Sequence, residues 1–174
     1  MLQIYYGKGK GKTSSALGLI LRASAYNKRI ILFQFFKPSK IFSGEHLSLK
    51  KLKNVKQVRF NQQHPMFLKN SKKQTPQELK KNIDKTILEL KKILRKKDFD
   101  ILVCDEILNV IHKNLVKENK IVKIFCRIKN DKEIILTGRN KPDKLLKIAD
   151  YVTEFSLKKH PFKKGILARK SIEF

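Results

Sequence analysis

Short apolar runs rich in Ile, Val, Phe and Tyr alternate with helical patterns along the whole chain, and this alternation constrains the fold more than any other feature. Strands are predicted over residues 2–6, 29–35, 55–60, 100–106, 133–138 and 150–155. Helices are predicted over residues 13–26, from Pro76 to near Lys97, over about 118–129, and in a short segment from Pro142. Continuous apolar strands separated by helices favour an α/β fold with a mostly parallel sheet and helices on both faces.

The length and the cysteine usage favour one cytoplasmic domain. The chain has 174 residues and no internal repeat or linker, so we expect a single domain over residues 1–174. Cys104 and Cys126 lie in apolar segments without a C-x-x-C pair, which predicts two buried, reduced thiols. No run approaches the roughly 18–20 apolar residues of a membrane helix. No secretion signal precedes the first strand, so we expect neither export nor a membrane partner.

The chain is strongly basic, with 41 Lys and Arg against 15 Asp and Glu and a net charge of +26. One interpretation is a surface for nucleic acid or anionic membranes. The other is compositional drift, because only seven of the 41 are arginines and Lys, Ile, Asn and Phe share AT-rich codons. Nucleic-acid recognition favours Arg and interleaved aromatic residues, and the chain has no Trp. We therefore favour drift and do not expect a nucleic-acid partner.

The segment GKGKGKTS (7–14) follows the first predicted strand and precedes the first predicted helix, which is the context of a phosphate-binding loop. Its glycines would let backbone N–H groups approach phosphate oxygens, Lys12 would add a positive charge, and Thr13 could offer its hydroxyl to Mg²⁺. The usual pattern G-x-x-x-x-G-K-[ST] would need a glycine at position 6, which is Tyr6. The loop is therefore one residue short, although its position after a strand favours phosphate binding over a chance match.

A second motif, DILVCDE (100–106), is an apolar strand that ends in two carboxylates. Ligands bind at the carboxyl ends of strands in open α/β sheets, which is where Asp105 and Glu106 would lie. One carboxylate would hold magnesium directly or through water, and the other could position water or metal. Together with the loop, this strand predicts a nucleotide site.

Three further stretches narrow the choice: QFFK (34–37) with GE (44–45), EIILTGRNKPDKLLKIADYVTEF (133–155), and KKHPFKKGILARKSIEF (158–174). With the loop and the Asp-Glu strand, they resemble the P-loop family of ATP:corrinoid adenosyltransferases over nearly the whole chain. The short loop matches as well, because that family reads G-x-G-K-G-K-[ST]-T. The resemblance implies a single-domain P-loop fold of the RecA-like kind.

The resemblance also implies a reaction, in which the 5′-deoxyadenosyl group of ATP moves to the Co(I) of a reduced corrinoid and triphosphate leaves. This is a step of cobalamin biosynthesis, with ATP and a corrinoid as substrates and Mg²⁺ or Mn²⁺ as the metal. The implied ATP-binding residues are Gly7, Lys8, Gly9, Lys10, Gly11, Lys12, Thr13, Ser14, Arg22 and Arg139. Lys12 and Glu106 would have catalytic roles. The implied metal ligands are Thr13, Asp105 and Glu106.

Four residues keep a structural alternative beside the implied role. Arg139 either contacts triphosphate or ribose or forms an ion pair at a strand end, and Arg22 either matches a family arginine or lies on a solvated helix face. Glu45 either contacts nucleotide or caps a helix. We expect His160 to be structural rather than a cobalt ligand.

The chain departs from the family pattern on the corrinoid side, where a Phe and a Trp are expected after the third strand. Here FNQQHPMFLKN (60–70) contains neither Trp nor Gly, so Phe67 or Met66 would replace the aromatic contact. The chain also reads Pro38 where a glycine usually follows Lys37. Its first predicted strand begins at residue 2, where the family commonly carries an N-terminal extension, so we do not expect that extension here. The resemblance further implies a flavin-type reductase as partner and allows a homodimer. Another P-loop ATPase, a small-molecule kinase and a basic nucleic-acid-binding module remain alternatives.

Overall fold

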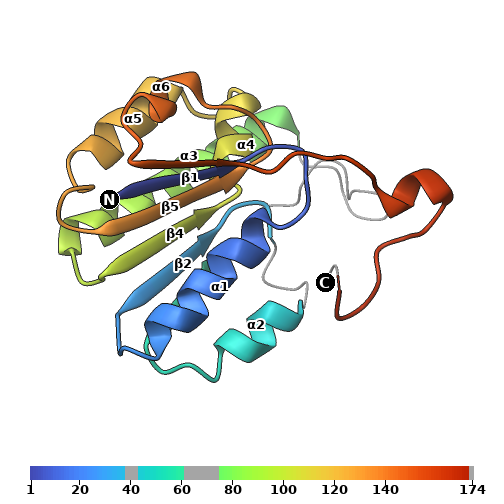
Figure 1. Cartoon of the computed structure of the whole chain (residues 1–174). Coiled ribbons are helices and arrows are strands. Elements are labelled where there is room, and N and C mark those ends of the chain that lie inside the picture. Colours follow the sequence, from blue (N-terminus) through green and yellow to red (C-terminus); the bar gives the residue numbers. More distant parts are fainter. Residues whose placement is uncertain (38–42, 61–74, 173–174) are drawn as a thin grey trace.

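A six-stranded sheet organises the computed structural model, which describes residues 1–37, 43–60 and 75–172 (Figure 1). The strands are β1 (Leu2–Tyr6), β2 (Ile30–Gln34), β3 (Val55–Arg59), β4 (Ile101–Asp105), β5 (Glu133–Gly138) and β6 (Tyr151–Glu154). Their order is β3-β2-β4-β5-β1-β6, and every neighbouring pair runs parallel. The predicted α/β class and the six predicted strands are confirmed.

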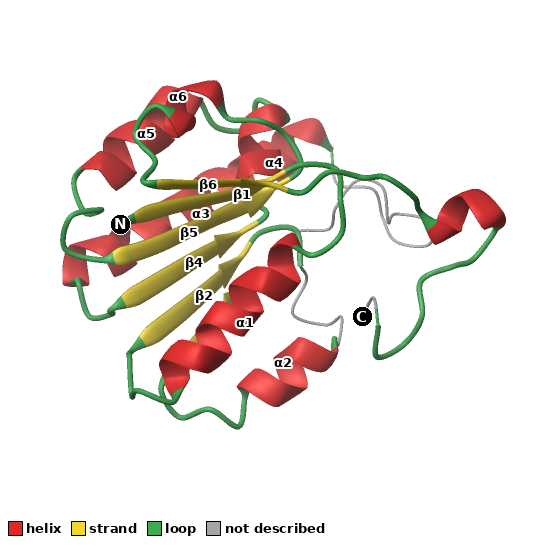
Figure 2. Ribbon diagram, viewed as in Figure 1, coloured by secondary structure: helices red, strands yellow, loops and turns green. Residues whose placement is uncertain are grey.

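The helices cover both faces of the sheet, as predicted (Figure 2). They are α1 (Lys12–Ser24), α2 (Gly44–Leu49), α3 (Pro76–Lys96), α4 (Ile107–His112), α5 (Glu118–Cys126) and α6 (Asp143–Leu146), followed by a short 3₁₀ helix (Pro161–Lys164). The sequence analysis anticipated α1, α3, α5 and α6 but neither α2 nor α4. Both missed helices have six residues, which is too short for a 3.6-residue periodicity to be recognised.

The core consists of two apolar layers, one on each face of the sheet. On one face α1 and α2 bury Ala16, Ile20 and Leu49 against strand residues such as Leu32 and Val103. On the other face α3, α4, α5 and α6 pack on alternate strand residues; this layer includes Ile83, Ile87, Leu90, Ile107, Ile121, Phe125, Leu145, Ile4, Phe33, Leu102 and Leu136. Because both layers are apolar, the strands are buried on both sides, which explains why they read as continuous apolar runs.

The longest helix, α3, starts where the sequence indicated. Thr75 is its N-cap and accepts a hydrogen bond from the backbone N–H of Glu78 at 3.2 Å, while the Glu78 carboxylate accepts one from the Thr75 N–H at 2.8 Å. Pro76 occupies the first helical position, where its missing N–H costs nothing. The helix ends at Lys96, and its C-cap, Lys97, adopts a left-handed conformation.

One prediction about the cysteines is wrong. Cys104 is buried in β4, as expected, but Cys126 is exposed at the end of α5. The helix buries Ile121 and Phe125, which lie four residues apart on one face, and Cys126 is turned about 100° away from that face. Among the described residues, none of the helices is long and apolar enough to cross a membrane.

Candidate active site at the carboxyl edge of the sheet

The loop after β1 and the acid at the end of β4 meet at the same edge of the sheet. Strand β5 lies between β1 and β4 and pairs with both in parallel, so all three strands end at that edge (Figure 1). The segment that follows β6 also leaves from this edge and then curves back toward α2 (Figure 1). In open α/β sheets this edge is where ligands bind.

The glycines of the loop allow it to pack against the chain that follows β6. Gly7 and Gly11 have φ values of 121° and 116°, which L-residues rarely adopt. The Gly9 N–H donates to the carbonyl oxygen of Phe155 at 2.7 Å, and a Cβ on Gly9 would lie only 2.7 Å from the carbonyl oxygens of Phe155 and Ser156. The loop is therefore held in shape by a neighbouring backbone segment before any ligand binds.

The loop leads directly into the N-terminus of α1. Gly11 is the N-cap and has no side chain with which to accept from the first N–H groups, and α1 shows no side-chain cap within the described structure. The N–H groups of the first turn and the positive end of the helix dipole therefore remain available to an anion.

Lys12 folds back over the loop. Its ammonium donates to the carbonyl oxygen of Gly9 at 2.6 Å, and the residue is buried. Burial lowers the pKa of Lys12 and Arg139 lowers it further, whereas Glu106 and Asp105 oppose the shift in part. The side chain must leave the Gly9 carbonyl to reach a phosphate.

The Asp105 carboxylate is fully buried, and both of its oxygens are occupied. Oδ1 accepts from the hydroxyl of Thr13 at 2.9 Å and from that of Thr137 at 2.7 Å. Oδ2 accepts from Gln34 Nε2 at 3.3 Å and lies 3.1 Å from Lys37 Nζ. Burial alone would raise the pKa of Asp105, but Lys37 and the two hydroxyls outweigh it, so the net pKa is lowered and the group is ionised.

Glu106 lies in a different environment although it is the next residue. It adopts a left-handed conformation (φ 68°) as the N-cap of α4, and its N–H donates to Thr137 Oγ1 at 3.0 Å. Its carboxylate accepts from Asn109 Nδ2, and Asn109 Oδ1 in turn accepts from the Arg139 N–H at 2.7 Å. Burial and the neighbouring Asp105 raise the pKa of Glu106. The start of α4 is thus tied to the end of β5.

A third acidic group completes the cluster. Glu45, in the first turn of α2, lies 3.2 Å from Lys37 Nζ, so Lys37 bridges the Glu45 and Asp105 carboxylates. Burial opposes charge on all three groups, yet their mutual attraction dominates, lowering the pKa of Glu45 and raising the pKa of Lys37. The sequence allowed two roles for Glu45, a contact with the nucleotide or a cap of a helix. In the structure its carboxylate forms an ion pair with Lys37.

An open cavity of about 430 Å³ begins at this cluster. Its lining residues are Thr13, Ser14, Leu17, Lys37, Gly44, Glu45, Ser48, Ser171 and Ile172. They come from α1, the end of the segment after β2, α2 and the C-terminal segment, and several carry hydroxyl or charged groups. The cavity is large enough for a small ligand that continues from the loop.

The comparison with known protein families agrees with this geometry. The family described as ATP:corrinoid adenosyltransferase BtuR/CobO/CobP matches residues 1–174 of the chain.

The chain belongs to this family.

Three curated relatives are named corrinoid adenosyltransferase. A corrinoid adenosyltransferase of Sinorhizobium sp is 28% identical over 97% of this chain and 77% of its own length. The corrinoid adenosyltransferase of Pseudomonas aeruginosa is 27% identical over the whole of this chain and 83% of its own length. That of Escherichia coli (strain K12) is 25% identical over 98% of this chain and 84% of its own length.

The structure brings together most, but not all, of the residues that the sequence analysis proposed for this family's site. Arg139 follows β5 and lies near enough to Lys12 and Glu106 to affect the pKa of both. Lys8, Lys10 and Ser14 are exposed at the loop and the start of α1. Arg22 is exposed in the last turn of α1, ten residues or about 15 Å along the helix from Lys12, so it is not brought to the loop.

Three other residues lie away from the cluster or outside the description. His160 is exposed just before the 3₁₀ helix. Phe67 and Met66, proposed for the corrinoid side, fall outside the described residues.

The sequence analysis missed three polar residues that hold the cluster together, namely Gln34, Thr137 and Asn109. Gln34 and Thr137 are buried polar residues near the carboxyl ends of β2 and β5. The sequence does carry a signal for Gln34 and Thr137, because each is a polar residue at the end of an otherwise apolar strand. Asn109 lies in α4, a helix that was not predicted, so its position could not be inferred.

The oxygen groups of the cluster fit a small divalent cation that arrives with a nucleotide. Thr13, Asp105 and Glu106 supply hydroxyl and carboxylate oxygens, the ligands that Mg²⁺ prefers. Within residues 1–37, 43–60 and 75–172, His, Cys, Asp and Glu do not form a group of three that could hold a metal unaided. Since Mg²⁺ commonly uses one or two carboxylates together with substrate phosphates, such a group is not needed.

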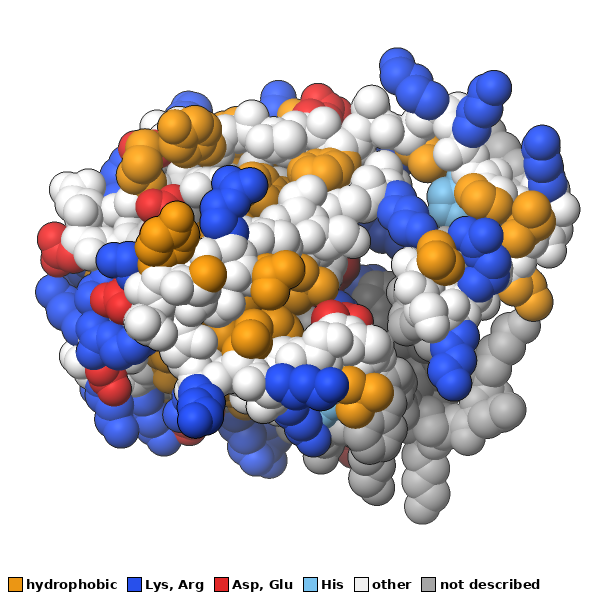
Figure 3. Space-filling model, turned by 60° about the horizontal axis from the view of Figure 1, so that its bottom comes forward, with side chains coloured by type: hydrophobic (Ala, Val, Ile, Leu, Met, Phe, Trp, Pro, Cys, Tyr) orange, Lys and Arg blue, Asp and Glu red, His pale blue; other side chains and the backbone are white. Residues whose placement is uncertain are grey.

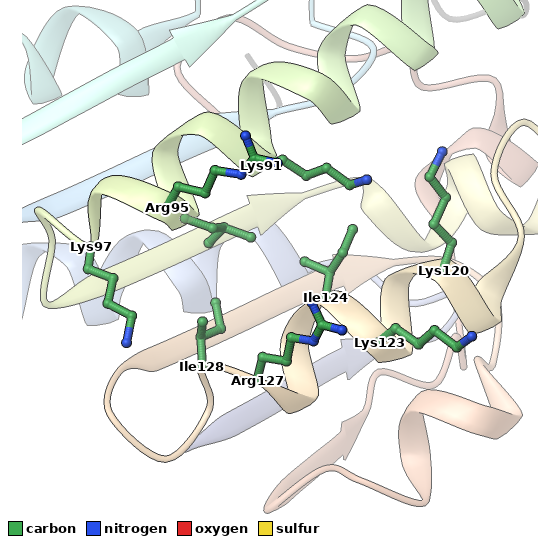
Figure 4. Close-up of a pocket in the computed structure, with 9 residues that line it drawn as sticks. Lys91, Arg95, Lys97, Lys120, Lys123, Ile124, Arg127 and Ile128 are labelled. Carbon is green, nitrogen blue, oxygen red and sulfur yellow. The ribbon is translucent and has the colours of Figure 1, made fainter.

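Another cavity, of about 570 Å³, lies away from this site, between α3 and α5 (Figure 4). Its lining combines the apolar residues Leu94, Ile124 and Ile128 with cationic residues such as Arg95 and Arg127. It contains no residue of the loop or of the Asp105 cluster.

Lys and Arg side chains are also spread widely over the face seen in Figure 3, so basic character does not single out one binding site.

Proposed function

We propose that this chain transfers the 5′-deoxyadenosyl group of ATP to the Co(I) of a reduced corrinoid and releases triphosphate. The observation that carries the proposal is the hydrogen bond from Thr13 to Asp105 (2.9 Å), which joins the loop to the acidic strand, in a chain that matches the family over residues 1–174. The names of the curated relatives support the same activity.

The proposed chemistry does not require a general base. Co(I) is a strong nucleophile and can attack the 5′ carbon of ribose directly, so no proton has to be removed. Asp105, the most central carboxylate, is engaged on both oxygens. The protein's task is then to orient ATP and to stabilise the triphosphate that leaves.

Lys12 and the start of α1 are proposed to bind the leaving triphosphate. The N–H groups of the first turn point along the helix axis toward the loop, where they would add to the charge of the Lys12 ammonium. Lys8, Lys10 and Arg139 lie around the same loop and are proposed to supply further positive charge.

Mg²⁺ or Mn²⁺ is proposed as the metal, held by Thr13 and Asp105 with Glu106 close by. The Thr13 hydroxyl gives its hydrogen to Asp105, so its oxygen lone pairs remain available to a cation. When bound, the metal would neutralise part of the triphosphate charge.

The cavity between α1 and α2 is proposed to receive the part of ATP beyond the phosphates. It opens at Thr13 and Ser14 and includes Glu45, whose carboxylate can accept hydrogen bonds from ribose hydroxyls. We also propose that Phe67 or Met66 contacts the corrinoid and that a flavin-type reductase supplies Co(I). The proposal further includes a homodimer and a cytoplasmic location.

The test is corrinoid adenosylation followed by absorbance, with ATP and chemically reduced Co(I) corrinoid. Wild type should form the adenosylated corrinoid, and Lys12→Ala should lose about 10²–10³-fold in rate, as expected for removal of a group that stabilises developing charge. Lys85→Ala, which removes an exposed lysine of α3, is the matched control and should remain at the wild-type rate. A folded Lys12→Ala enzyme with the wild-type rate would contradict the assigned role.

A further inference from the structure

Lys37 is the cation paired with Asp105 in the described structure. Its ammonium lies 3.1 Å from Asp105 Oδ2 and 3.2 Å from Glu45 Oε1. Lys12, on the loop, donates instead to the Gly9 carbonyl. An ionised carboxylate that is fully buried needs such a partner, because burying an unpaired charge is strongly unfavourable.

The backbone conformation just before Lys37 places its side chain next to Asp105. The Phe35 N–H donates to the Asp105 carbonyl oxygen at 3.0 Å, which extends the pairing of β2 with β4 by one residue. Phe36 then adopts φ 55°, a left-handed conformation that is unfavourable for an aromatic residue, while its side chain is buried. Such a conformation persists where the surrounding structure enforces it.

The position of Lys37 conflicts with a divalent cation at Asp105. Lys37 and a metal would both be attracted to the same buried carboxylate and would repel each other at short range. The Asp105 oxygens are already occupied by two hydroxyls, one amide and one ammonium. A metal can join this carboxylate only if one of those groups is displaced, and Lys37 is the one that it repels.

We propose that Lys37 is the resident counter-ion of the metal site and exchanges with the metal. Before substrate binds, Lys37 neutralises Asp105 and keeps free metal out. When a nucleotide brings its metal and its negative charge, Lys37 releases Asp105, stays anchored to Glu45, and turns its charge toward the triphosphate. This inference rests on the proposed use of Thr13 and Asp105 as a metal site.

The test measures Mn²⁺ binding to the nucleotide-free protein by electron paramagnetic resonance. Lys37→Gln removes the charge and should bind Mn²⁺ at least tenfold more tightly than wild type. Lys37→Arg keeps the charge and should bind as weakly as wild type. Lys50→Gln, which removes an exposed lysine just after α2, controls for net charge and should also match wild type. Equal Mn²⁺ affinity of folded Lys37→Gln and wild type would overturn the proposal.

Thermal unfolding gives a second readout from the same variants. In a chelator, Lys37→Gln should melt at a lower temperature than wild type, and Mn²⁺ should restore most of the loss, whereas Mn²⁺ should not shift wild type. If Lys37→Gln does not fold, the variant Glu45→Gln tests the same proposal. Without its second anchor Lys37 should stay on Asp105, so the affinity for Mn²⁺·ATP should fall at least tenfold more than the affinity for metal-free ATP, which reports any lost contact between Glu45 and the nucleotide itself. Equal losses of affinity for Mn²⁺·ATP and for metal-free ATP, or no loss for either, would overturn the proposal.

These measurements need no corrinoid, so they are separate from the proposed activity. The expected Mn²⁺ pattern in a protein that forms no adenosylated corrinoid would refute the activity and retain the role of Lys37. Adenosylation by a protein in which Lys37→Gln leaves Mn²⁺ affinity unchanged would refute the role of Lys37 alone.

Discussion

Thr137→Val would remove the hydroxyl that joins Asp105 and Glu106 while keeping the side chain's shape. The Thr137 hydroxyl donates to Asp105 Oδ1 at 2.7 Å and accepts from the Glu106 N–H at 3.0 Å, and the residue is fully buried. Valine can do neither. The substitution therefore weakens the support of a buried charge and leaves a backbone N–H without its acceptor.

The expected cost follows from these two contacts. A hydrogen bond to a charged group contributes about 1.5–3 kcal/mol, and an unsatisfied donor costs about 1–3 kcal/mol. The extra apolar group of valine returns about 1 kcal/mol. We therefore expect the free energy of unfolding to fall by about 3 kcal/mol, which for a chain of this size corresponds to a melting temperature about 6–12 °C lower.

Urea unfolding followed by circular dichroism measures this change. Thr153→Val, at an exposed threonine of β6, is the matched control and should change the free energy of unfolding by less than about 0.5 kcal/mol. Thr137→Ser keeps the hydroxyl and should lose less stability than Thr137→Val. If Thr137→Val were no more destabilising than Thr153→Val, the assigned role of the hydroxyl would be wrong.

Two further predictions concern packing and acid stability. Gly138→Ala should lower the free energy of unfolding, measured in urea, by about 1–3 kcal/mol, because the new Cβ would lie 2.5 Å from Leu108 Cβ. Gly18→Ala, where a Cβ on α1 meets no other atom within 4 Å, is the control and should raise the free energy of unfolding by about 0.5–1 kcal/mol. Equal effects of the two substitutions would contradict the packing argument. Hydrogen bonds from Arg29 lower the pKa of Asp100 from 3.8 to about 2, so this contact stabilises the fold above pH 3.8 and is lost as the pH falls toward 2. Asp100→Asn should reduce the steepness of the stability loss over that pH range in acid titrations, and an unchanged slope would refute the contact's contribution.

The sheet and the main site residues could be predicted because their signals are local. Each buried strand is a continuous apolar run, and the glycines and Lys12 of the loop are adjacent in sequence. Placing Asp105 beside Thr13 required only that two parallel strands end at the same edge.

The rest of the cluster depends on register, which the sequence does not specify. Gln34 reaches Asp105 because β2 and β4 pair with these two residues opposite each other. Lys37 reaches Asp105 through the left-handed turn at Phe36, a conformation that no residue pattern indicated. Asn109 depends on α4, whose six residues carry too little periodicity to be recognised.

The central claim is that the triphosphate leaves ATP as one unit while the 5′ carbon of the ribose forms a bond to cobalt. The most direct measurement is phosphorus nuclear magnetic resonance of the products after wild-type protein has reacted with ATP and Co(I) corrinoid, together with the yield of adenosylated corrinoid. The account predicts inorganic triphosphate and adenosylated corrinoid in equal amounts. ADP and phosphate without a cobalt–carbon bond would contradict it.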